Sequence, residues 1–116
     1  MSIDAADEIQ DLGSNYGVPS TGPVQGPAGA GIAANLADLL DGTTSSSLSG
    51  AGVLAAATDY WTFSTATGAL SANNCNNGFL TGLSGQVGNS SFSNGQWLDD
   101  GTALCLLGKY LICTCY

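Results

Sequence analysis

The 116-residue chain contains no histidine and no arginine, and Lys109 is its only basic side chain. Without histidine the chain lacks the usual general base and the commonest metal ligand, so it cannot build a Ser-His-Asp or Cys-His catalytic site. Nine acidic residues give a net charge of -8. Because no basic patch can displace counterions from phosphates, we expect no binding to nucleic acid and none to anionic membranes.

Several recognisable motifs are also absent. No apolar run reaches the roughly 18 residues of a membrane span, and no glycine-rich loop has the phosphate-binding spacing. The N-terminus, Met1–Glu8, is acidic and lacks the basic start and apolar core of a secretory signal. The only closely spaced cysteines are Cys113 and Cys115, not the CxxC pairs of structural zinc, and Asp99 and Asp100 lack further calcium ligands. We expect a non-enzymatic chain without metal or cofactor.

The C-terminal stretch 90–116 carries the strongest pattern in the chain. Turn signals occur at Asn94-Gly95, Asp100-Gly101 and Gly108-Lys109. Such dipeptides suit the two-residue turns that join twisted antiparallel strands. The stretch therefore predicts an antiparallel β-meander of four short strands.

Two-residue turns would place Phe92 opposite Trp97, Trp97 opposite Leu104, and Leu104 opposite Cys113. Since side chains alternate across a strand, both faces of this sheet would be apolar. A surface sheet with one solvated face would not show this pattern. Each face must be covered, either by the rest of the domain or by a partner chain.

The same register constrains the four cysteines. It places Cys105 on the opposite face from Cys113 and Cys115, too far for a disulfide. Cys113 and Cys115 lie two residues apart on one strand with parallel side chains. Cys75 is then free to pair with only one of the other three. At least one cysteine is left as a thiol or for another chain.

Four cysteines in a small chain indicate an oxidising environment, whereas the acidic N-terminus predicts no export signal. Three explanations remain open. The protein is made inside a cell and oxidised after release, its signal has been removed, or its thiols are buried and free.

The rest of the chain predicts a mainly β or α+β protein in two parts, an N-terminal helix plus extended arm (1–31) and a small helix-plus-sheet domain (32–116). The predicted helices are Asp4–Leu12, Ala30–Leu40 and a short Val53–Ala57. The arm, Gly13–Gly31, holds all three prolines. A strand is expected over Tyr60–Thr65, a hairpin turn at Asn77-Gly78, and loops over Thr43–Gly52 and Ser84–Asn89.

These features favour a structural component of a larger assembly. The bulk of Gly, Ala, Ser, Thr and Asn, the helix-plus-arm 1–31 and the Cys113-Thr114-Cys115 tail resemble the small decoration or linking proteins of tailed-phage capsids. That resemblance implies a virion-surface location, symmetric or trimeric placement on a lattice of major capsid protein, and disulfides formed after lysis.

Two other functions remain open: a secreted or surface-exposed, extracellular β-rich adhesin or filament subunit, and a small cytosolic cysteine redox protein. The candidate disulfide cysteines are Cys75, Cys105, Cys113 and Cys115. The candidate interface residues are Phe92, Trp97, Leu104, Leu111, Ile9 and Leu12.

Overall fold

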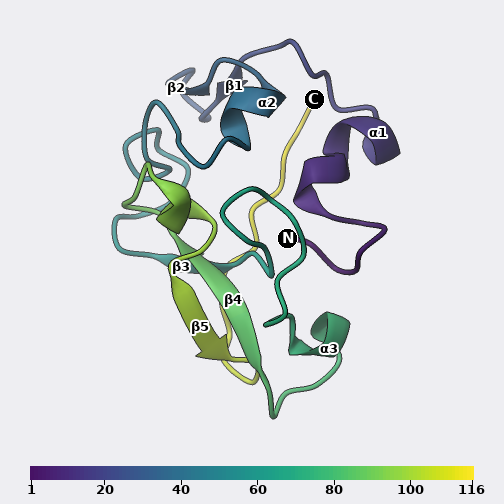
Figure 1. Ribbon diagram of the computed structural model, residues 1–116. Coiled ribbons are helices and arrows are strands. Elements are labelled where there is room, and N and C mark those ends of the chain that lie inside the picture. The colour runs from purple at the N-terminus through teal and green to yellow at the C-terminus, as the bar shows by residue number, and fades with distance from the viewer.

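The computed structural model describes residues 1–116 and contains two antiparallel sheets (Figure 1). The smaller sheet pairs β1 (Val24–Gln25) with β2 (Gly31–Ala33). The larger sheet has the order β3-β4-β5, formed by β3 (Asp59–Trp61), β4 (Ser84–Asn89) and β5 (Gly101–Leu104). The expected mainly β or α+β class, with an antiparallel meander in the C-terminal half, is confirmed.

The helices are all short, at three to five residues. They are the 3-10 helices η1 (Ile9–Asp11) and η2 (Gly95–Trp97) and the α-helices α1 (Leu12–Tyr16), α2 (Leu36–Leu39) and α3 (Cys75–Gly78). None has the length and apolar character that a membrane-spanning helix requires.

The predicted four-strand meander and its register over residues 90–116 are wrong. Asn94 does not begin a hairpin turn, because its side chain accepts a hydrogen bond from the backbone N–H of Gln96 at 3.1 Å and caps η2. Trp97 therefore lies in a helical turn and not opposite Phe92. Leu104 pairs with Ser84 rather than with Trp97 or Cys113. The same Asn-Gly chemistry that suits a turn also suits a helix N-terminus.

The predicted loop Ser84–Asn89 is also wrong, because this segment is β4, the central strand of the larger sheet. Asn89 pairs with Asp59 of β3, and Ser84 pairs with Leu104 of β5. Its sequence, Ser-Gly-Gln-Val-Gly-Asn, has low intrinsic strand propensity. Pairing on both edges and packing on both faces override that propensity.

The two glycines of β4 are required by close packing. A Cβ at Gly85 would lie 2.6 Å from the Cys75 sulfur and 2.6 Å from the Phe63 ring. A Cβ at Gly88 would lie 2.0 Å from the backbone oxygen of Trp97. Neither position can hold a side chain without moving its neighbours, so β4 is glycine-containing for steric reasons.

Gln86, between these glycines, is a buried polar residue that forms several hydrogen bonds. Its Nε2 donates to an Asp99 carboxylate oxygen at 2.5 Å and to the Gly101 carbonyl at 2.7 Å. Its backbone oxygen accepts from the N–H groups of Thr62 and Phe63, each at 3.2 Å. With its polar groups partnered in this way, Gln86 fixes β4 against both neighbouring segments.

The N-terminal helix begins later than predicted. Asp4 uses its carboxylate to accept from the Ala6 N–H at 2.8 Å, and it forms a bridge with Asp7 instead of capping a helix. Helical structure starts at Ile9 and ends at Tyr16, where Gly17 adopts a φ of +68°. Gly13, the residue after the predicted helix Asp4–Leu12, lies within α1.

The predicted helix Ala30–Leu40 is reduced to its second half. Gly31–Ala33 instead forms β2, and α2 begins after Asn35, whose side chain accepts from the Asp38 N–H at 2.9 Å. The predicted extended arm thus contains the end of α1 and half of a hairpin, and the predicted boundary at residue 31 falls inside β2.

Three further local predictions are corrected. Val53–Ala57 forms turns and bends instead of a helix, and the strand predicted over Tyr60–Thr65 is the shorter β3, Asp59–Trp61. Asn77-Gly78 is not a hairpin turn but the end of α3, in which Asn76 and Asn77 have φ values of +52° and +57°. The loop Thr43–Gly52 has no helix or strand, as expected.

The core lies where the small hairpin and α2 meet the larger sheet (Figure 1). Tyr60 is central to it, because its hydroxyl donates to the backbone oxygen of Trp97 while its ring is buried. The buried cluster consists of Ile32, Ala33, Leu36, Leu39, Leu48, Ala51, Tyr60, Trp97 and Leu98.

Replacing Gly88 by alanine should destabilise the fold by about 2 kcal/mol or more, because the new methyl group would meet backbone atoms of Trp97 that cannot turn aside. Urea unfolding followed by circular dichroism measures the loss. Gly82→Ala is the matched control, because a Cβ there meets no atom within 4 Å. Equal stability of the two variants would contradict the packing of β4 against Trp97.

Alkaline pH should destabilise the protein through Tyr60. Burial raises the pKa of its hydroxyl above the ordinary value of 10.0, so the folded state favours the neutral form. This stabilisation is complete below the unfolded pKa of about 10 and is lost as the pH rises above it, by about 1.4 kcal/mol per pH unit.

Tyr60→Phe should remove most of this pH dependence in urea unfolding measured from pH 8 to 11. Tyr16→Phe is the control: a hydrogen bond to Asp7 raises the pKa of Tyr16 on the protein surface, and its removal should leave most of the loss in place. The assignment to Tyr60 is overturned if the two variants behave alike.

Candidate functional site

One end of the larger sheet is closed by a disulfide. Cys75, at the start of α3, is bonded to Cys105, just after β5, with their Cα atoms 5.8 Å apart. The backbone N–H of Cys105 also donates to the Leu83 carbonyl at 2.9 Å. In Figure 1, α3 and the end of β5 lie on either side of the lower end of β4. The disulfide and this hydrogen bond together join three segments at this end.

Large apolar side chains are exposed around the disulfide. Phe79 is 81% exposed and Leu106 is 62% exposed, and neither packs on the core. We call this surface the apolar tip, formed by Phe79, Leu80, Leu83, Leu104, Leu106 and Leu107. An exposed group of this kind is typical of protein interaction surfaces.

The apolar tip contains no charged residue. Between Asp59 and Asp99 the sequence has no acidic or basic side chain, and between Asp100 and Lys109 it has none either. The negative charge of the chain is therefore located elsewhere and does not repel a partner from the tip.

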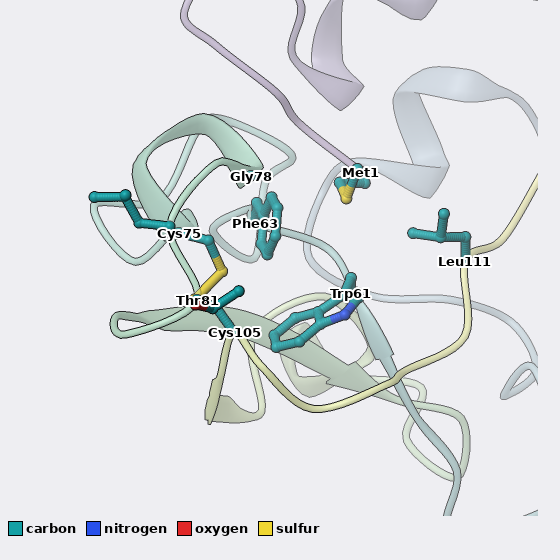
Figure 2. Close-up of a pocket in the computed structure, with 9 residues that line it drawn as sticks. Met1, Trp61, Phe63, Cys75, Gly78, Thr81, Cys105 and Leu111 are labelled. Carbon is teal, nitrogen blue, oxygen red and sulfur yellow. A yellow bond between two sulfur atoms is a disulfide. The ribbon is translucent and has the colours of Figure 1, made fainter.

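A small pocket of about 210 Å³ adjoins the apolar tip (Figure 2). Trp61 and Phe63 line it with ring centroids 5.3 Å apart, and the disulfide lies beside Phe63. Phe63 has a φ of +51°, which is rare for a bulky residue and persists only where the surroundings fix it. Leu111 lines the same pocket and links it to the C-terminal segment.

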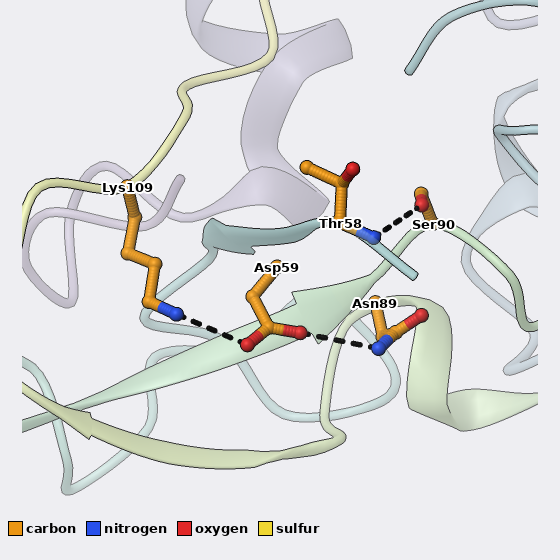
Figure 3. Close-up of polar contacts among 5 residues, drawn as sticks. All are labelled: Thr58, Asp59, Asn89, Ser90 and Lys109. Carbon is orange, nitrogen blue, oxygen red and sulfur yellow. Dashed lines mark hydrogen bonds and ion pairs between the residues drawn. The ribbon is translucent and has the colours of Figure 1, made fainter. Parts of the chain in front are cut away.

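The C-terminal segment, residues 109–116, runs across the molecule, and we call it the strap. Its near end is tied to β3, because Lys109 Nζ lies 3.0 Å from an Asp59 carboxylate oxygen and the Trp61 N–H donates to the Tyr110 carbonyl at 3.0 Å. The other Asp59 oxygen accepts from Asn89 of β4 (Figure 3). Figure 3 also shows the neighbouring bond from the Thr58 N–H to the Ser90 hydroxyl, at 3.0 Å.

Beyond Tyr110 the strap is held more loosely. No backbone–backbone hydrogen bond involves residues 111–116. Ile112 packs against the core, and the hydroxyl of Tyr116 donates to the Tyr16 carbonyl at 2.6 Å. Figure 1 shows this segment running from the sheet towards the gap between α1 and α2. Cys113 and Cys115, on this part of the strap, are exposed thiols.

The predicted interface residues separate into two groups. Leu104 and Leu111 are 50% and 58% exposed and lie at or beside the apolar tip. Trp97 is only 6% exposed, so its ring is buried in the core and offers a partner little surface. Phe92, Ile9 and Leu12 are half-buried, and the last two pack against the core.

The structure pairs Cys75 with Cys105 and leaves Cys113 and Cys115 as thiols. No group of three or more His, Cys, Asp or Glu side chains is placed to hold a metal ion. Sequence reasoning missed the tip residues Phe79, Leu80, Leu83, Leu106 and Leu107. The charge-free runs between Asp59 and Asp99 and between Asp100 and Lys109 are the signal that could have indicated them.

Comparison with known proteins gives no relative: no protein-family model, curated protein or solved structure matches this chain.

Alkylation of the folded protein should modify two cysteines, and alkylation after reduction and unfolding should modify four. The reason is that Cys113 and Cys115 are exposed on the strap, whereas Cys75 and Cys105 are bonded to each other. Intact mass spectrometry counts the adducts and peptide mapping places them. Modification of Cys75 or Cys105 without reductant would contradict this pairing.

Proposed function

We propose that the protein is a non-enzymatic linking component of a larger protein assembly. The apolar tip binds a neighbouring subunit, and the thiols of the strap provide covalent links to it. The observation that carries the proposal is the position of the two free thiols. They lie within residues 111–116, which make no backbone–backbone hydrogen bond, while the other two cysteines are bonded to each other within the chain.

The apolar tip supports a protein partner in particular. Its leucine and phenylalanine side chains carry no charge, and burial against another apolar surface would stabilise a complex by about 25 cal/mol per Å² removed from water. Nucleic acid and anionic membranes remain disfavoured as partners, because the chain has a single basic side chain and it is paired with Asp59.

The disulfide supports an oxidising location. Bonds of this kind persist on virion and cell surfaces and outside cells. Together with the resemblance to phage decoration and linking proteins, this favours a virion surface, with capsid subunits as partners and symmetric copies on the lattice. The same thiols would close intermolecular disulfides after lysis.

The linking role is tested on the assembly isolated from its natural source, with free thiols blocked during lysis. On a denaturing gel without reductant the chain should run in high-mass species, and reduction should return it to 11.5 kDa. Mass spectrometry should find Cys113 or Cys115 joined to a second polypeptide. A monomer in both lanes, with Cys113 and Cys115 both alkylated, rules out the covalent role.

Two tagged variants separate the contribution of the tip from that of the thiols. Leu106→Asp introduces a charge at a 62% exposed position, so it should abolish incorporation into the assembly without unfolding the chain. Ala28→Asp introduces the same charge at an exposed turn residue between β1 and β2 and should incorporate normally. Equal incorporation of both variants would show that the tip is not the interface.

A further inference from the structure

Two asparagine–glycine pairs, Asn77-Gly78 and Asn94-Gly95, have exposed asparagines. At such a pair the backbone nitrogen of the glycine can attack the side-chain carbonyl carbon of the asparagine and close a cyclic imide. Glycine favours this step because it has no side chain to hinder the approach and leaves the backbone free to rotate. The local backbone geometry then decides which pair reacts.

The backbone of Asn94 brings the attacking nitrogen close to the side chain. The next nitrogen eclipses Cβ at a ψ of about -120°, because the substituents of Cα are about 120° apart. Asn94 has a ψ of -174°, so a rotation of about 55° brings the Gly95 nitrogen beside its side chain. Asn77 has a ψ of 34°, which turns the Gly78 nitrogen away from its side chain. Of the two asparagines, Asn94 is therefore the one near the reactive conformation.

The Gly95 nitrogen is also available for attack. No group of the chain accepts a hydrogen bond from the Gly95 N–H. The Gly78 N–H, by contrast, donates to the Asn74 carbonyl at 2.9 Å. This bond must break before the Gly78 nitrogen can react, so it protects Asn77.

The side chain of Asn94 is held over the peptide bond that attacks it. Asn94 Oδ1 accepts from the Gln96 N–H at 3.1 Å, so the side chain folds across the intervening Gly95. The same hydrogen bond draws electron density from Cγ and stabilises the negative charge that develops on Oδ1 during attack. The Asn94 side chain is thus both positioned and activated.

We propose that Asn94 is a site of deamidation that needs no enzyme. The Gly95 nitrogen loses its proton to water and bonds to Asn94 Cγ, the Cγ–Nδ2 bond breaks, and ammonia leaves. One water molecule then opens the cyclic imide. Cleavage of its N–Cγ bond gives aspartate. Cleavage of its other N–C bond gives isoaspartate, in which the main chain runs through the former side chain.

The two products differ in their effect on the core. Aspartate keeps an oxygen for the Gln96 N–H and is favoured before a helix. In isoaspartate the former Asn94 carbonyl becomes a carboxylate outside the main chain, although this carbonyl accepts from the Trp97 N–H at 2.9 Å. Trp97 in turn accepts from the buried Tyr60 hydroxyl. Isoaspartate therefore loosens the core at Trp97 as the protein ages.

Gly95 cannot readily be exchanged for a residue that would slow the reaction. A Cβ there would lie 2.9 Å from the Ala66 methyl group. The close packing that requires this glycine thus also keeps Asn94 reactive. The site does not depend on the linking role, because Asn94 is not part of the apolar tip or the strap.

The test is incubation of the folded protein at neutral pH and 37 °C, followed by mass spectrometry of chymotryptic peptides. Deamidation adds about 1 Da, and an isoaspartyl methyltransferase labels the isoaspartate. In the folded protein Asn94 should convert faster than Asn77 by roughly tenfold or more. In guanidinium chloride with the disulfide reduced, the two should convert at similar rates, because the folded geometry is lost.

Asn94→Ser is the matched control for the effect on the core. Serine keeps a capping oxygen but has no amide to lose, so its urea midpoint should stay constant during incubation. The midpoint of the original protein should fall as isoaspartate accumulates at position 94. Asn94→Asp, which reproduces the other product, should start close to the midpoint of the original protein.

The proposal is overturned if Asn77 converts as fast as Asn94 in the folded protein. It is overturned equally if Asn94 stays unmodified in the folded protein while it converts in guanidinium chloride. The effect on the core is ruled out if the midpoint of the original protein falls no further than that of Asn94→Ser.

Discussion

Most of this structure depends on two positions of β4, Gly85 and Gly88, where there is no room for a side chain. At Gly85 the strand is covered by the Cys75 sulfur and by the rings of Trp61 and Phe63, and at Gly88 it is covered by the backbone of Trp97 and the ring of Tyr60. These contacts place the disulfide, the aromatic pair and the core on one short strand. The chain has few charges and many small residues, so close packing of the β4 backbone against aromatic rings is an important source of its stability.

Neutral polar groups connect the remaining segments. Gln86 joins β4 to the segments on either side of it, and Asn89 extends the Lys109–Asp59 ion pair into the sheet. Amides and hydroxyls can be buried at little cost when each is hydrogen-bonded. The single buried exception is Trp97 Nε1, which has no hydrogen-bond partner in the protein.

The fold class was predictable from the sequence, but the position of the sheet was not. None of the predicted turn dipeptides joins two strands of the observed sheets, and Asn94-Gly95 begins a 3-10 helix because capping by the Asn94 side chain competes with hairpin formation. The strand Ser84–Asn89 could not be recognised, because its glycines are explained only by residues distant in sequence, such as Cys75 and Trp97. A local side-chain cap decided the first case, and tertiary packing decided the second.

The candidate site, like the fold, was only partly predictable from the sequence. Two free thiols were compatible with the predicted pairings, and Leu104 and Leu111, proposed for their apolar character, are exposed. Trp97 was placed on the surface only because the assumed register put it there. The disulfide partner of Cys75 could not be chosen from sequence, because the choice depends on where β5 ends relative to α3.

The ion pair of Lys109 has a consequence for proteolysis. Trypsin cleaves after lysine or arginine, and this chain offers it one such bond, between Lys109 and Tyr110. The lysine side chain is 21% exposed, and the next residue is hydrogen-bonded to β3. Cleavage there would detach residues 110–116 with both thiols in a single step. The apolar tip, with its disulfide, and the larger sheet would remain together in the longer fragment, residues 1–109.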